Sequence, residues 1–384
     1  MPQWLEQALG TLLVLVVLLD VFLTVLYARM GTGFLSYRLG RITWLLFRGL
    51  AKPFGPRSGD VLSLCGPALL VLVVLVWASA LTLGAALVMH PMLGTSIRTS
   101  SGDTPTDFIA ALYAGGSSMA IVGASDFTPH TGPARLLYLF NSLVGASVLS
   151  LTLSYLVQVY SGLQQRNALG LKVDLLSDGT GDAAELVAGL GPRGEFSAGY
   201  SNLTNLAADM TSAKEAHHFY PVLFYFRFRT ARYSVSRISL LAFDTVTLIR
   251  TALDHERYGW LEETASMTQL RHASMMLVTS LEDAYLPGGL PEARALPDQQ
   301  TVARWRRRYF AALRRLQQAG IQTASDKETG AESYVALRGE WDRYVAALAP
   351  SMAYDLAEID PAGSAPEPAD ELRESETQGA RRSV

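Results

Sequence analysis

Three long apolar stretches, each about one bilayer in length, constrain what this chain can fold into. They cover residues 9–27, 61–89 and 136–163. Asp20 is the only charged residue in the first stretch, and the other two contain none. Since a helix rises about 1.5 Å per residue, each stretch is long enough to cross the hydrocarbon core of a membrane. The sequence therefore predicts an all-α membrane protein with three transmembrane helices.

A shorter apolar segment lies between the second and third stretches. Thr104 is expected as the N-cap of a helix, Pro105 as its first residue and Asp107 as an acid in its first turn, and the helix is expected to end near Met119. This segment is too short to cross a bilayer, so it predicts a re-entrant helix and loop between spans two and three. Backbone at membrane depth must be buried in protein or line a watery path, which is the structural demand of an ion pore.

The composition changes after residue 163. Hydrophobic residues make up 49% of the 384 residues and charged residues 17%, but the charges concentrate in the second half. Apolar residues recur there at helical spacing in segments 203–210, 238–253, 267–281, 302–316 and 334–348. These segments predict a helical domain over residues 164–350. Residues 351–384 are expected to be a disordered tail, since too little apolar surface follows Asp360.

The distribution of cationic side chains predicts which side of the membrane each loop faces. The connection between the first two spans carries only Asp60 against six cations, whereas the loop around the short helix has Arg98 and few others. By the positive-inside rule, residues 1–60 form the first span and a cytoplasmic interfacial segment, and the domain after the third span is also cytoplasmic. Apolar residues at 42–50 predict a short helix lying in the membrane interface. The six cations are Arg29, Arg38, Arg41, Arg48, Lys52 and Arg57.

A short motif follows the expected re-entrant helix, with the sequence Ile121, Val122, Gly123, Ala124, Ser125 and Asp126. With this motif, residues 61–163 resemble the pore module of tetrameric potassium channels. The family's filter reads Thr-Val-Gly-Tyr-Gly-Asp, and the motif aligns with it without a gap. The resemblance implies a selectivity filter at residues 121–125, with Asp126 tying the filter to the pore helix or attracting cations at the mouth. It also implies an inner-helix hinge at Gly145 and a homotetramer, because one chain supplies one pore loop.

The motif departs from the family pattern at three positions. Ile121 stands where the family has threonine, Ala124 replaces the tyrosine that braces the filter, and Ser125 replaces the second glycine. Filter carbonyls replace the water shell of the ion, and glycine allows the backbone angles that this requires. Two functions therefore stay open. One is a channel for potassium or another monovalent cation, and the other is a non-conducting membrane scaffold or sensor that retains the channel fold.

The third span supplies the expected pore lining. If it packs as the family's inner helix, Ala146, Leu149, Leu153 and Val157 form one stripe toward the pore axis. We hypothesise that rings of these apolar side chains form a gate, which closes when water leaves the narrow pore. The alternative for each position is ordinary packing between helices.

Asp20 is the intramembrane acid of the chain. An acid inside a span is costly and usually has a partner or a function. We expect a structural hydrogen bond with Trp77, Ser79 or Thr82, and a proton or cation relay is the alternative.

Other function classes receive little support. The net charge of -3 gives no nucleic-acid footprint, and no residues near His217 and His218 complete a metal site. No HExxH run, P-loop or nucleophile elbow occurs, so neither an enzyme nor a bound cofactor is expected. The expected setting is the bacterial inner membrane, with lipid and further copies of the chain as partners and the cytoplasmic partner unidentified. Six arginines are expected mostly outside the apolar stripe of 302–316, facing solvent or anionic lipid: Arg304, Arg306, Arg307, Arg308, Arg314 and Arg315.

Overall fold

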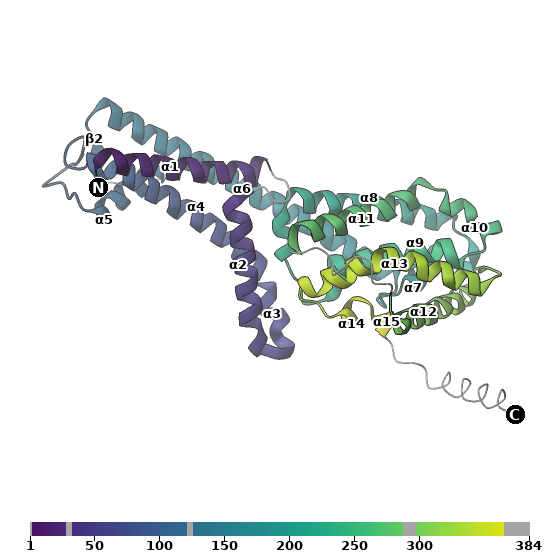
Figure 1. The fold of residues 1–384 in the computed structure, drawn as a ribbon. Coiled ribbons are helices and arrows are strands. Elements are labelled where there is room, and N and C mark those ends of the chain that lie inside the picture. The colour runs from purple at the N-terminus through teal and green to yellow at the C-terminus, as the bar shows by residue number, and fades with distance from the viewer. Residues whose placement is uncertain (1, 28–32, 121–125, 287–296, 365–384) are drawn as a thin grey trace. The chain divides into compact units, whose positions relative to one another are not determined.

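The computed structural model describes residues 2–27, 33–120, 126–286 and 297–364 (Figure 1). The chain divides into two compact units, residues 1–164 with 215–229 and residues 165–214 with 230–384. Three helical stretches are long and apolar enough to cross a membrane, and they contain the expected stretches 61–89 and 136–163 and all but the last residue of 9–27. They run over Gln3–Leu26, Ser58–Met92 and Gly132–Leu176.

Two of these spans cross at a pair of glycines. Helix α1 (Gln3–Val21) continues into a π-helical turn, Phe22–Leu26, and packs against α4 (Cys65–Met89). A Cβ atom on Gly10 would lie 2.6 Å from the Gly84 carbonyl oxygen, and one on Gly84 would lie 3.0 Å from the Gly10 oxygen. Small residues let two backbones approach closely where lipid gives no hydrophobic driving force. The third span is the first part of α6 (Gly132–Leu176).

The basic connection folds into α2 (Phe34–Ala51), a 3₁₀ turn (Lys52–Arg57) and α3 (Ser58–Ser63). Figure 1 shows α2 running across the direction of α1 and α4. One face of α2 is buried at Gly40, Thr43 and Trp44, whereas Leu45 and Leu46 on another face are exposed. The segment 42–50, expected to be an interfacial helix, therefore lies inside α2 with an uncovered apolar side.

Residues 215–229 belong to the first unit, which the expected domain at 164–350 did not anticipate. The ring of Trp44 contacts those of Phe224 and Tyr225, at centroid distances of 6.4 and 6.1 Å. The ring of Phe226 lies so close to Gly66 that a Cβ there would come within 2.6 Å of it. Burial of this aromatic run against α2 and α4 accounts for its place in the first unit.

The second unit is helical, as its apolar periodicity predicted. Its central helix is α9 (Val235–Ala252), which is buried along nearly its whole length. Each of the five predicted segments falls in a helix, although the second continues one residue past the end of α9. The other α-helices of this part are the end of α6, α7 (Ala183–Leu190), α8 (Ser197–Phe219) as far as residue 214, α10 (His255–Glu262), α11 (Ala265–Tyr285), α12 (Gln299–Gln318), α13 (Lys327–Ser351), α14 (Leu356–Ile359) and α15 (Pro361–Ser364).

A network of buried charges joins α9, α12 and α13. Asp244 accepts hydrogen bonds from Arg308 Nε at 2.9 Å, Arg308 Nη2 at 2.7 Å and the Tyr334 hydroxyl at 2.7 Å. Asp360 accepts from Arg308 Nη1 at 2.8 Å and Arg338 Nη2 at 2.6 Å. The expectation that Arg308 lies outside the apolar stripe is therefore wrong. Two carboxylates compensate its charge, which makes its burial possible.

The C-terminal segment is folded as far as residue 364. Tyr354 and Ile359 are buried, and Asp360 joins the charge network. The tail expected over 351–384 is thus wrong for its first part, because these few side chains find partners on the helices. Residues 365–384 lie outside the described residues.

Candidate functional site

The short helix α5 (Phe108–Met119) starts later than the sequence suggested. Its N-cap is Asp107, whose carboxylate accepts a hydrogen bond from the Ala110 amide at 2.7 Å. The expectation of Thr104 as N-cap and Pro105 as first helical residue is wrong. The Thr104 hydroxyl instead accepts a hydrogen bond from the Thr99 amide at 3.1 Å, which holds it in the loop. Aspartate is as good an N-cap as any residue, so the helix begins one turn later.

Two short strands hold together the chain on either side of α5. Strand β1 (Ile97–Thr99) follows α4, and strand β2 (Phe127–Pro129) precedes α6. They pair antiparallel, with Arg98 opposite Thr128, and the Ser100 amide donates to the Asp126 carbonyl oxygen at 3.0 Å. The chain leaving α4 and the chain entering α6 therefore meet at one end of the unit, with α5 and residues 121–125 between them.

Small residues bring α5 against α4. A Cβ on Gly115 would lie 2.7 Å from the Ala86 amide nitrogen, and one on Gly116 would lie 3.2 Å from Thr82 Cγ2. Ala111 and Ala114 of α5 are fully buried in the same contact. Side chains of this size allow backbone contact between the helices, so α5 is held firmly along its length.

The last turn of α5 is fixed by α6. The Asn141 side chain donates to Ser118 Oγ at 2.9 Å, and the Ser142 hydroxyl donates to the Ser118 carbonyl oxygen at 3.1 Å. A Cβ on Gly145 would overlap the Met119 carbonyl oxygen and lie 2.9 Å from the carbonyl carbon. Gly145, the expected hinge, is thus where α6 touches the backbone that leads into the filter motif.

The remaining expected pore residues are exposed in the single chain. Ala146, Leu149, Leu153 and Val157 lie on an open face of α6, and the exposed fraction rises from 44% at Leu149 to 67% at Val157. Asp126 is exposed too, and its backbone carbonyl rather than its carboxylate takes part in the bond with Ser100. Ile121, Val122, Gly123, Ala124 and Ser125, the expected filter, lie outside the described residues.

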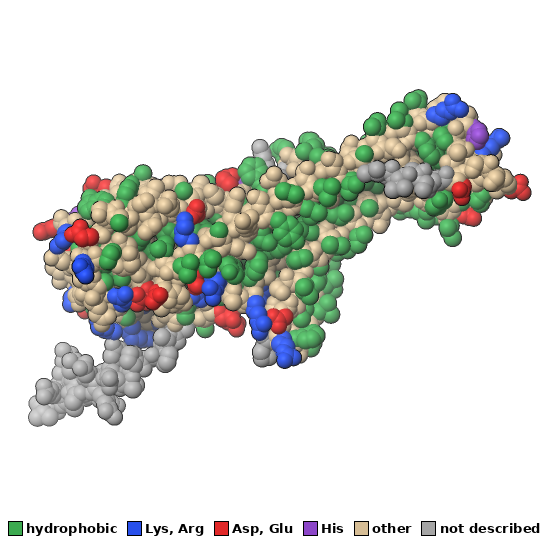
Figure 2. Space-filling model, turned by 180° about the vertical axis from the view of Figure 1, so that it is seen from behind, with side chains coloured by type: hydrophobic (Ala, Val, Ile, Leu, Met, Phe, Trp, Pro, Cys, Tyr) green, Lys and Arg blue, Asp and Glu red, His purple; other side chains and the backbone are tan. Residues whose placement is uncertain are grey.

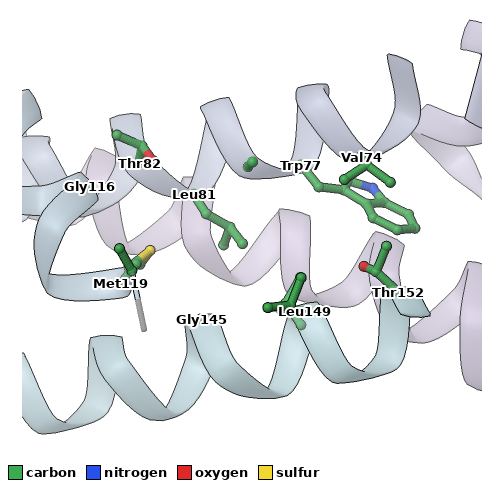
Figure 3. A pocket seen from close by; sticks show the side chains of 12 residues that line it. Val74, Trp77, Leu81, Thr82, Gly116, Met119, Gly145, Leu149 and Thr152 are labelled. Carbon is green, nitrogen blue, oxygen red and sulfur yellow. The ribbon is translucent and has the colours of Figure 1, made fainter. Parts of the chain in front are cut away.

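A cavity of about 250 Å³ separates α4, α5 and α6 (Figure 3). Met119 and Gly116 lie at one end, and Trp77 and Thr152 lie at the other. Leu149 belongs to the wall of this cavity as well as to the exposed stripe of α6. The lining is mainly apolar, so the cavity offers room for side chains to rearrange next to the end of α5.

Asp20 is buried and ties three helices together. Its carboxylate accepts hydrogen bonds from Trp77 Nε1 of α4 at 2.8 Å, from the Leu35 amide at 2.8 Å and from the Ser36 hydroxyl at 3.1 Å. Trp77 was among the expected partners, whereas Leu35 and Ser36 in the first turn of α2 were not. The Asp20 carboxylate thus accepts a hydrogen bond from a backbone amide in the first turn of α2, where amides have no partner within the helix, as a capping residue does. This arrangement is that of a structural tie.

Comparisons with known proteins support the assignment as a membrane protein and identify no function. No family model matches the chain, and no solved structure matches it. A curated relative is the uncharacterized membrane protein YdjJ of Bacillus subtilis (strain 168), which is 27% identical over 172 residues. The match covers 44% of this chain and 49% of that protein, so the chain spans about half the length of its relative. With three apolar helices of spanning length, the chain is a helical membrane protein.

Proposed function

We propose that this protein is the subunit of a tetrameric, potassium-channel-like cation channel in a bacterial inner membrane. The observation that carries the proposal is the pairing of β1 with β2, which brings both ends of the loop containing α5 to the same end of the first unit. A segment that starts and ends on one side, between two spans, is the arrangement of a re-entrant pore loop.

The length of α5 supports this interpretation. Its 12 residues extend about 18 Å, well short of the ~30 Å hydrocarbon core. In the proposed channel the filter motif then lies at an intermediate depth, where irregular backbone needs protein or water around it. The contacts of Ser118 and Met119 with α6 hold the last turn before the motif. In the proposed pore, carbonyl groups of residues 121–125 replace the water shell of a monovalent cation.

The open face of α6 supports assembly around an axis. Leu149, Leu153 and Val157 are uncovered in one chain, at the spacing of a single helical stripe. In a ring of four copies this stripe faces the axis and supplies the apolar lining of the inner pore. Closed cyclic symmetry places the same residues of every copy at the same height, so each position forms a ring.

We also propose that α2 contacts lipid on the cytoplasmic side. Figure 2 shows hydrophobic side chains over the spanning helices and along the projecting α2 and α3, with cations near the tip of the projection. Arg41 and Arg48 of α2 and Lys52, the first residue of the 3₁₀ turn that follows, are exposed, as are Leu45 and Leu46 of α2. A helix with apolar and basic edges is suited to an interface that contains anionic lipid. Replacing the three cations by glutamine should reduce the thermal stabilisation that anionic lipid gives in nanodiscs.

The filter motif provides the test of the channel proposal. The triple substitution Ile121→Thr, Ala124→Tyr and Ser125→Gly restores the family pattern, so potassium flux into liposomes should become more selective over sodium. A pore with an intact scaffold gains this selectivity because carbonyl geometry and the aromatic brace are both restored. If wild type and the triple variant both lack flux, the channel proposal fails and the non-conducting scaffold remains.

A further inference from the structure

One histidine bridges the first span and the start of α5. His90 begins the 3₁₀ turn that follows α4, and its Nδ1 lies 2.7 Å from Glu6 Oε1 of α1. Its Nε2 lies 3.1 Å from the carbonyl oxygen of Thr106, the residue before the N-cap Asp107. The ring of Phe108 stands edge-on to the imidazole at 5.7 Å. A single side chain thus connects α1 with the loop that positions α5.

The two hydrogen-bond partners of the His90 imidazole determine how many protons the two bonds require. A backbone carbonyl only accepts, so Nε2 must carry a hydrogen to bond with Thr106. The other nitrogen, Nδ1, then faces a carboxylate at hydrogen-bond distance, which requires one further proton on either His90 or Glu6. Without that proton, a lone pair on Nδ1 and a carboxylate oxygen face each other. A neutral imidazole beside an ionised Glu6 therefore keeps one of the two bonds and loses the other.

We propose that His90 and Glu6 are positioning residues that hold the start of α5 to α1 only while they share a proton. Acid on this side of the membrane keeps the bridge whole, and alkali breaks it. Glu6 is the charged group that faces His90 from α1, and the Asp107 carboxylate next to Thr106 is already bonded to the Ala110 amide.

Hydrogen exchange of a peptide covering residues 104–115 tests the proposal in the full-length protein. At about pH 5.5, below the histidine range, His90→Gln should exchange about five- to tenfold faster than wild type, the factor expected for one lost hydrogen bond. At about pH 8.5 the difference between the two proteins should be smaller, since an imidazole without the shared proton keeps one of its two hydrogen bonds. Comparing proteins at the same pH cancels the pH dependence of the exchange chemistry itself.

Two further variants separate a proton-dependent bridge from a purely structural contact. Glu6→Gln offers an amide hydrogen to Nδ1 of a neutral imidazole, so it should keep the peptide protected at both pH values. His130→Gln removes an exposed histidine that is bonded to Thr128 of β2, and it should leave the wild-type pattern unchanged. Equal protection of wild type and His90→Gln at the lower pH would overturn the proposal, as would a Glu6→Gln protein with the wild-type pH dependence. Hydrogen exchange does not depend on conduction, so the result tests the His90 proposal independently of the channel proposal.

Discussion

Replacing Gly145 by alanine tests whether α6 fixes the end of α5. The added Cβ would overlap the Met119 carbonyl oxygen and lie 2.9 Å from its carbon, whereas real Cβ contacts under 3.0 Å essentially do not occur. The two backbones would have to separate by roughly 1 Å, and forcing extra volume into a packed site costs about 1–3 kcal/mol. Alanine recovers about 0.5–1 kcal/mol of this, because it is the better helix former. We expect a net destabilisation of about 0.5–2 kcal/mol.

Thermal unfolding of the purified full-length protein in detergent measures this effect, at about 1–2 °C per kcal/mol for a chain of this length. The chain contains a matched control. Gly49 lies inside α2, where an added Cβ would have no atom within 4 Å, so Gly49→Ala should stabilise by up to about 1 kcal/mol. Gly116→Ala, whose Cβ would lie 3.2 Å from Thr82 Cγ2, should fall between the two. A Gly145→Ala protein that melts at or above the wild-type temperature would refute the close contact.

Three further perturbations test other parts of the account. Asp20→Asn leaves one acceptor oxygen for donors from Leu35, Ser36 and Trp77, so the unfolding midpoint should fall by an amount equivalent to about 2 kcal/mol. Asp244→Ala leaves Arg308 buried without its main partner and should cost about 3–5 kcal/mol in denaturant unfolding, with Asp360→Asn costing less because Asp360 is partly exposed. Leu153→Asn should raise the resting cation leak of liposomes if this side chain closes the pore by dewetting, and an unchanged leak would remove Leu153 as a gate.

The outline of the fold was predictable because it depends on local composition. A run of uncharged residues needs no distant partner to be recognised as a span, and apolar periodicity marks the helices of the second unit. The position of residues 215–229 was not predictable in the same way. Trp44 and Gly66, which cover this aromatic run, lie more than 150 residues away in the chain. The burial of Arg308 likewise depends on carboxylates 64 and 52 residues away.

The site was predictable in part. Thr104 and Asp107 are both competent N-caps, and the choice between them follows from the Thr99 amide, which engages Thr104. The partnership of Asp20 with Trp77 followed from the cost of an acid in a span, but its bond to the Leu35 amide depends on how α2 follows α1. One signal was overlooked. Consecutive antiparallel spans bring the start of α1 and the end of α4 to the same membrane boundary, where Glu6 and His90 are the ionisable residues that meet.

Cation flux through the purified protein in liposomes tests the central claim most directly. Potassium, sodium and a large organic cation would be compared across a range of voltage and pH, beside a Gly123→Phe control that obstructs the expected filter. The account predicts a flux of potassium or other small monovalent cations that exceeds that of the organic cation and disappears in the control. Wild-type flux no greater than that of the control under every condition would contradict it.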